Sequence, residues 1–226
     1  KREHTNQVDA TPAACNLGVC KLSKYHSARV NADIYKSLKQ EPPGKAIVEP
    51  TAMEVEISDI SSLEPFFNRL QEGSAAQAIY TDHIGSYEKY MKGAYYTDGR
   101  IDLCKQVVGP THIGALMKSF VRNPNIKHFL LGNNIINRVG AFAIADFIRN
   151  PARLPQIETW YLAGNAIDGL GLEDIVNSML DDHHPACTQL WLKRNPLGVI
   201  GAKSLAKLLS TNPPIKVLDL DNTYIT

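Results

Sequence analysis

At residues 157–167 the chain reads Ile157-Glu-Thr-Trp-Tyr-Leu-Ala-Gly-Asn165-Ala-Ile167, and this pattern occurs four times. Apolar residues stand two positions apart before the asparagine, which is typical of a short strand with one buried face. The other copies read Ile126-Lys-His-Phe-Leu-Leu-Gly-Asn-Asn134-Ile-Ile136, Cys187-Thr-Gln-Leu-Trp-Leu-Lys-Arg-Asn195-Pro-Leu197 and Ile215-Lys-Val-Leu-Asp-Leu-Asp-Asn-Thr223-Tyr-Ile225. Their recurrence predicts a chain built from stacked structural repeats.

The copies begin 31, 30 and 28 residues apart and are separated by amphipathic stretches. Each of the first three copies is followed by a glycine near the start of such a stretch, at Gly140, Gly171 and Gly201, and by a proline after its end, at Pro151, Pro185 and Pro213. A further proline, Pro124, stands just before the first of these copies. A proline does not continue a helix and biases the preceding residue toward an extended conformation. Each copy therefore predicts one strand followed by one helix.

Asparagine stands at the end of the strand in three copies, at Asn134, Asn165 and Asn195, and Thr223 takes its place in the fourth. Its side-chain amide can bond backbone groups of the turn that would otherwise be unsatisfied, so we predict a structural role. A weaker copy runs from Ile101 to Val108, with Gln106 at the asparagine position and a helix expected from Ile113 to Val121.

Strand, asparagine turn and helix ending in Asn-Pro together resemble the ribonuclease-inhibitor-like class of leucine-rich repeats. The resemblance covers residues 100–226 and implies an α/β solenoid of four to five repeats, with parallel strands on the concave face and helices on the convex face. The last copy stops after its strand, so we expect further repeats or a neighbouring molecule to cover it. Self-association through this unfinished repeat is one possibility.

Side chains between the buried columns point to the concave surface, where we expect a protein partner to bind. Tyr161 and Trp191 are adjacent there, and Lys193-Arg194 follows at once, in keeping with the enrichment of Trp, Tyr and Arg at binding hot spots. The alternative is that Trp191 only packs over its neighbours. The predicted partner-binding residues are Tyr161, Trp191, Lys193, Arg194, Leu130, His128, Asp219 and Asp221.

Before the repeats the sequence changes character. Residues 1–30 are polar and predict a poorly ordered arm, whereas residues 31–99 predict an α+β segment that caps the solenoid. Within it we expect a strand at Met53–Ile57 and a helix opened by the capping box Ser61-Ser-Leu-Glu64. Five tyrosines suit the apolar edge of a helix packed on the first repeat: Tyr80, Tyr87, Tyr90, Tyr95 and Tyr96. A separate activity of this segment is the alternative.

The composition argues against several classes of partner. The 24 basic and 23 acidic residues nearly cancel, so we expect neither nucleic acid nor a membrane surface as a partner. Four cysteines are too few for a disulfide-rich secreted scaffold, which favours a cytoplasmic protein. The sequence begins at Lys1 without Met, so we expect that any targeting signal precedes it.

Three short motifs resemble catalytic or metal-binding sites, but the repeat pattern explains the same residues better. Asp219-Leu-Asp221-Asn-Thr223 matches the D-x-D-x-T motif of haloacid-dehalogenase-like phosphotransferases, but the repeat already predicts the register of this segment. Asp181-Asp-His-His-Pro-Ala-Cys187 holds metal-ligand residue types at poor spacing. Cys104, with His128 one strand away, suggests a thiol nucleophile and its base, but little in the pattern places Cys104 on the outside. We therefore predict no catalytic residue, no metal and no cofactor.

The prediction is a protein-interaction module and not an enzyme. Repeats of this class also occur in GTPase activators and in effectors that bacteria inject into hosts, which leaves an alternative: a regulator of an enzyme, or a secreted effector acting in a host cytosol. A GTPase activator supplies an arginine from an exposed loop, and Arg138 and Arg194 near the repeat turns are the candidates.

Overall fold

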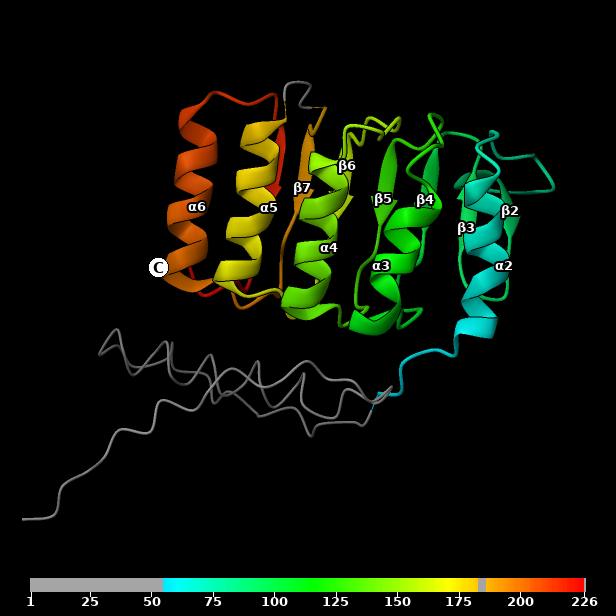
Figure 1. Ribbon diagram of the computed structural model, residues 1–226, viewed down its shortest axis with the longest axis horizontal. Coiled ribbons are helices and arrows are strands. Elements are labelled where there is room, and N and C mark those ends of the chain that lie inside the picture. Colours follow the sequence, from blue (N-terminus) through cyan, green and yellow to red (C-terminus); the bar gives the residue numbers. More distant parts are fainter. Residues whose placement is uncertain (1–54, 183–185, 226) are drawn as a thin grey trace, which may run out of the picture.

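The computed structural model describes residues 55–182 and 186–225, and within them the fold is mixed α/β, with one eight-stranded sheet and five helices. The elements are α2 (Ile60–Gln71), β1 (Tyr80–Asp82), β2 (Gly85–Lys89), β3 (Ala94–Tyr96), β4 (Arg100–Asp102), α3 (Gly109–Ser119), β5 (His128–Leu130), α4 (Asn137–Arg149), β6 (Thr159–Tyr161), α5 (Gly169–Asp181), β7 (Gln189–Trp191), α6 (Gly198–Ser210) and β8 (Val217–Asp219). All the labelled helices lie on one side of the sheet (Figure 1). None of the helices described is long and apolar enough to cross a membrane.

The sheet follows the order of the chain from β1 to β8, antiparallel from β1 to β4 and parallel from β4 to β8. Phe129 pairs with Trp160, Trp160 with Leu190, and Leu190 with Leu218, which confirms the register predicted from the copies. Each of the four strands β4 to β7 is followed by a helix. These helices, α3 to α6, pack side by side in the order of the chain (Figure 1). The predicted first copy is confirmed too, although its helix α3 begins four residues earlier than expected, at Gly109.

The core lies between the sheet and the helices. The central column continues through Ile101, Phe129, Trp160 and Leu190, each 3 % exposed or less. At the last strand the burial weakens, because Leu218, Leu220 and Ile225 are only partly buried. This is the face for which we expected a cover.

The asparagine column forms a ladder of hydrogen bonds between neighbouring copies. The Asn165 side chain donates to Leu131 O at 2.8 Å and to Leu162 O at 3.0 Å, and its Oδ1 accepts from the Asn134 backbone N–H at 2.9 Å. Asn134 and Asn195 make equivalent bonds, and all three side chains are fully buried. Thr223 keeps only the bond within its own copy, to Leu220 O at 2.6 Å. The predicted structural role of these asparagines is confirmed.

The tyrosine-rich segment differs from the prediction. Four of the tyrosines, Tyr80, Tyr87, Tyr95 and Tyr96, lie on strands β1 to β3, and Tyr90 lies in the turn between β2 and β3. The prediction of a helix was wrong, because the segment pairs with β4 as an antiparallel extension of the sheet. Tyr95 continues the buried column beside Ile101, whereas Tyr87 and Tyr96 face the other side.

Helix α2 begins at a different residue from the one predicted. Asp59 is the N-cap, and its side chain accepts from the Ser61 backbone N–H at 3.3 Å, so the proposed capping box at Ser61 was wrong. The helix ends before Gly73, where a φ of +74° suits glycine. Of the predicted strand at Met53–Ile57, the first two residues lie outside the described ones, and only Glu56 makes a bridge.

Helix α2 is joined to the sheet by a buried ion pair. Arg69 donates to both carboxylate oxygens of Glu88 on β2, at 2.8 Å each, and the two side chains are 9 % and 3 % exposed. Glu88 stands in the core-facing column, opposite Tyr95. Its charge would be costly there without a partner, so Arg69 makes a polar residue acceptable at the end of an apolar column.

Candidate functional site

The sheet has one face that none of the described helices covers, which we call the open face (Figure 1). Two rows of side chains cross it from strand to strand. The first row contains Arg100, His128, Thr159, Gln189 and Val217, and the second contains Asp102, Leu130, Tyr161, Trp191 and Asp219. The strand register therefore brings five of the predicted binding residues onto one surface: His128, Leu130, Tyr161, Trp191 and Asp219.

Tyr161, Trp191, Lys193 and Asp219 form a cluster on this face, the aromatic cluster. The Tyr161 and Trp191 rings lie 5.8 Å apart between centroids and are tilted by 45°. The Lys193 ammonium lies 5.9 Å from the Tyr161 centroid and 5.6 Å from the Trp191 centroid, and 3.3 Å from the Asp219 carboxylate. Both rings remain half-buried. The carboxylate fixes the ammonium beside the two rings, and both aromatic side chains stay partly accessible.

Trp191 and His128 have further partners in the first row. The Trp191 Nε1–H donates to Gln189 Oε1 at 3.4 Å, and His128 Nδ1 lies 2.9 Å from Thr159 Oγ1. Between the aromatic cluster and Arg100 the face is hollowed, with a volume of about 310 Å³. The hollow is lined by Asp98, Arg100, His128, Leu130, Thr159, Tyr161, Gln189 and Trp191. Its wide opening suits a surface group of a large partner better than an enclosed small molecule.

Two predicted residues lie beside the cluster rather than in it. Arg194 and Asp221 are exposed in the turns that follow β7 and β8, and Arg194 has a φ of +58°. The Arg194 backbone N–H donates to Asp221 O at 2.8 Å, so the two turns are joined. Their side chains therefore border the aromatic cluster at one edge of the open face.

Sequence analysis missed a second group of aromatic side chains on the same face. Tyr80 and Tyr87 lie 5.8 Å apart, Tyr87 and Tyr96 lie 5.0 Å apart, and the Arg100 guanidinium lies 4.0 Å from the Tyr96 centroid. This tyrosine ladder extends the first row onto β1 to β3. The available signal was the adjacent pair Tyr95-Tyr96, because neighbouring residues on a strand face opposite sides and one of them had to leave the core.

Gly132 determines where the Tyr161 ring lies. A Cβ atom at position 132 would be 2.6 Å from Tyr161 Cε1 and 3.3 Å from Cys104 Sγ. Both distances are shorter than an ordinary carbon contact, and the Tyr161 ring is the neighbour that is free to rotate. The glycine therefore lets the ring lie close to residue 132 of the preceding copy.

We predict that Gly132→Ala rotates Tyr161 away from Trp191 and costs about 1 kcal/mol of stability or more, as small-to-large changes in packed sites do. The near-ultraviolet circular dichroism from the coupled rings should decrease, while far-ultraviolet dichroism stays unchanged. Gly114→Ala is the matched control, because a Cβ there meets nothing within 4 Å. An unchanged near-ultraviolet spectrum for Gly132→Ala would contradict this account of the ring position.

Cys104 and Arg138, which the sequence suggested as catalytic groups, already contact other groups of the protein. Cys104 is half-buried, and its Sγ accepts from the Gly132 backbone N–H at 3.3 Å. Burial, together with the charge of Asp102, raises the pKa of Cys104 to about 12, so the thiol is protonated at neutral pH. Arg138 pairs with Asp168 at 3.0 Å. Among residues 55–182 and 186–225 no group of three potential metal ligands occurs, and His183 and His184 lie outside these ranges.

Fold and surface together define a mixed α/β protein with repeated strand–helix units and an aromatic open face. No family model matches the sequence, and no curated protein matches it. Among solved structures, leiomodin-1 actin-binding site 2 (ABS2) is similar at 18 % sequence identity and a TM-score of 0.46, over 70 % of this chain and 78 % of that chain.

Proposed function

We propose that this chain is a leucine-rich-repeat solenoid that binds a protein partner on its open face, which is the concave face of such a repeat. The repeated asparagine ladder and the parallel register from β4 to β8 support the repeat class. The function is binding without catalysis, and the partner is a folded protein or an ordered segment of one.

The observation that carries the proposal is the aromatic cluster. Tyr161 and Trp191 contact each other and the Lys193 ammonium, which pairs with Asp219 of the next copy, so little side-chain freedom remains to be lost when a partner binds. Large aromatic side chains in a fixed and partly exposed position are the usual centres of protein interfaces. The open hollow beside them offers room for a protruding group of the partner.

We predict that Tyr161→Ala combined with Trp191→Ala weakens partner binding by about 2 kcal/mol or more, roughly 30-fold in the dissociation constant. The experiment captures partners with the wild-type chain, identifies them and measures their affinity for both forms by titration calorimetry. Both rings are only half-buried, so the variant should remain folded.

The matched control is Phe142→Ala on the outer side of α4, where the ring is 53 % exposed and far from the sheet. This control should bind as the wild type does. If the partner binds the double variant with unchanged affinity, or loses affinity equally with Phe142→Ala, the open face is not the binding surface.

A further inference from the structure

The sheet has two edges, at opposite ends of the row of helices, and β8 forms the C-terminal one (Figure 1). In four copies the backbone N–H of one leucine donates to a carbonyl oxygen of the next strand at 2.9 Å, and these residues are Leu103, Leu131, Leu162 and Leu192. Leu220 is the next residue of this column, and no strand of the described part of the chain accepts from its N–H. The edge of β8 is therefore open to a further strand.

The N-terminal edge of the sheet is β1, whose three residues are all exposed. Thr81 lies opposite Ser86 of β2, and Ser86 O accepts from the Thr97 backbone N–H at 2.9 Å. Ser86 therefore points its backbone groups away from Thr81, so the two residues form a pair without hydrogen bonds between them. The N–H and C=O of Thr81 point outward in turn. This edge is also open to a further strand.

Both ends of the sheet expose apolar side chains. The large ones at the N-terminal end are between 40 % and 81 % exposed, and they are Ile60, Ile79, Tyr80, Ile84 and Met91. At the C-terminal end Leu209 on α6 is 46 % exposed, and Leu218, Leu220 and Ile225 are only partly buried. Single exposed apolar residues are ordinary, but a group of them at each open edge indicates a contact surface.

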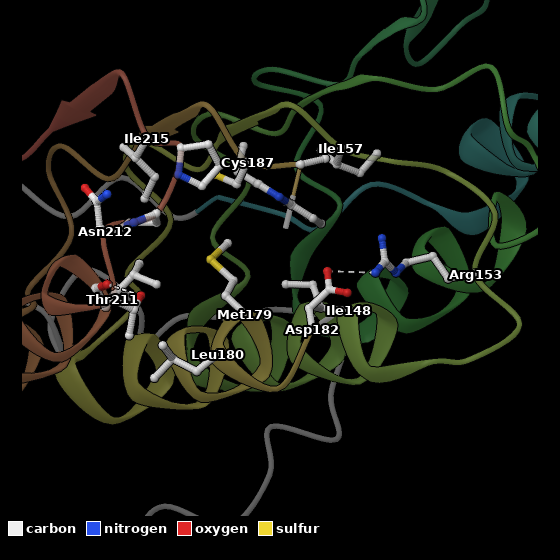
Figure 2. Close-up of a pocket in the computed structure, with 15 residues that line it drawn as sticks. Ile148, Arg153, Ile157, Met179, Leu180, Asp182, Cys187, Thr211, Asn212 and Ile215 are labelled. Carbon is white, nitrogen blue, oxygen red and sulfur yellow. Dashed lines mark hydrogen bonds and ion pairs between the residues drawn. The ribbon is translucent and has the colours of Figure 1, made fainter. Parts of the chain in front are cut away.

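The two ends carry charge of opposite sign. Residues 55–99 contain seven acidic and three basic residues, whereas residues 186–225 contain two acidic and five basic ones. Between them, residues 100–182 contain eight of each, and some of these pair between neighbouring copies, as Arg153 does with Asp182 at 2.8 Å (Figure 2). Lys203 and Lys216 at the C-terminal end are exposed and form no ion pair with any described residue. Unlike ends of two copies therefore attract, whereas like ends repel.

We propose that copies of this chain stack head to tail, with β1 of one copy pairing with β8 of another. Strand direction alternates from β4 back to β1, so β1 runs opposite to β4 and opposite to β8, which is parallel to β4. Copies in the same orientation therefore meet through an antiparallel strand pair, with both helix layers on one side of the joined sheet. The contact uses the sheet edges, so it does not depend on the proposed binding of a partner to the open face.

Side-chain alternation sets the register of this strand pair. Tyr80 lies on the open face with Tyr87, so Thr81 faces the helix side, as the core residue Leu218 does. Leu218 stands two residues before Leu220, so its backbone groups lie on the same open edge. Thr81 and Leu218 therefore stand opposite each other. The neighbouring pairs that follow are Ile79 with Leu220 on the helix side and Tyr80 with Asp219 on the open face.

Sedimentation velocity of the full chain between about 1 and 200 µM tests the stacking. The weight-average sedimentation coefficient should rise with concentration and should not level off at a dimer, because every head-to-tail assembly retains one free end of each kind. A chain that stays monomeric over this range would overturn the proposal, because one or both ends would then be covered by other residues of the chain or would not bind.

Two variants, each blocking one end, show whether unlike ends meet. Thr81→Pro removes the outward N–H of β1, and Leu220→Pro removes that of β8, at edge positions where proline is tolerated. Each variant alone should stay monomeric, whereas an equal mixture should form a dimer, since each retains the end that the other lacks. Circular dichroism checks that both fold. Self-association of Thr81→Pro would mean that two C-terminal ends meet, and a monomeric mixture would equally contradict the stacking.

A charge reversal tests the attraction without changing the strands. Lys203→Glu combined with Lys216→Glu gives the C-terminal end the sign of the N-terminal one, so it should weaken association about tenfold or more. Lys118→Glu is the matched control, because Lys118 is exposed on α3 in the middle of the row of helices, and its effect should stay below about twofold. Equal effects of the two charge reversals would rule out the ends as the contact.

Discussion

Arg69→Ala should lower the free energy of unfolding by about 3–5 kcal/mol, because it leaves the Glu88 carboxylate buried without its partner. Arg69 also donates to Ser74 Oγ at 2.9 Å and to Ala75 O at 2.8 Å, so the loop after α2 loses its anchor at the same time. Chemical denaturation followed by circular dichroism measures the effect. We expect the double variant Arg69→Met with Glu88→Leu to cost less than the single change, since a pair of apolar residues leaves no uncompensated charge.

The same pair makes stability depend on pH in a defined direction. Burial acts to raise the pKa of Glu88, but hydrogen bonds from Arg69, the Gln77 backbone N–H and Tyr90 outweigh it and hold the pKa below its ordinary value. A group whose pKa is lowered in the folded state stabilises the fold above its unfolded pKa. This contribution is lost as the pH falls below that value and through the folded pKa. Glu88→Gln should remove this part of the acid sensitivity, and an unaltered pH profile would count against the ion pair.

Asn165→Ala is expected to cost about 3 kcal/mol or more. The change leaves the Asn134 backbone N–H without its acceptor, removes two donors to buried carbonyls and opens a cavity in the ladder. Thermal and denaturant unfolding measure it. Asn165→Thr should cost less than Asn165→Ala, because Thr223 in the last copy shows that a hydroxyl can keep the bond within its own copy.

The control for the ladder is Asn222→Ala, at an exposed asparagine next to the Thr223 position. Its side chain bonds only Asp221 in the same turn, at 3.2 Å, and its φ of +54° is less favourable for alanine than for asparagine, so the change should cost no more than about 1 kcal/mol. A similar loss of stability at positions 165 and 222 would mean that the buried hydrogen bonds between copies contribute little.

The repeated part of the fold was predictable because its signal is local and recurs. Trp160 and Leu162 stand two residues apart in a strand pattern, and the same spacing at Leu190 and Leu192 predicted the pairing that β6 and β7 show. The antiparallel extension was not predictable in the same way. Tyr80 and Tyr87 lie seven residues apart, a spacing that also fits a helix. Only the pairing of β1 with β2, of β2 with β3 and of β3 with β4 decides between the two.

The sequence predicted which residues share the surface of the candidate site, but not how their side chains are arranged. Tyr161 and Trp191 were assigned to one surface because equivalent positions of stacked copies face the same side. That Lys193 lies over both rings and pairs with Asp219 depends on the spacing between three neighbouring strands. The tyrosine ladder was missed because its strands β1 to β3 were not expected.

The sequence by itself determined the order of the parallel strands β4 to β8, their buried columns and the asparagine ladder, since each copy carries apolar residues that are buried only when the copies stack. The tertiary structure decided what depends on how neighbouring elements pack: the contact of Arg69 with Glu88, and the position of Lys193 beside Tyr161, Trp191 and Asp219. These partners lie far apart along the chain, and the closeness of their side chains follows from how neighbouring elements pack, which no local pattern encodes.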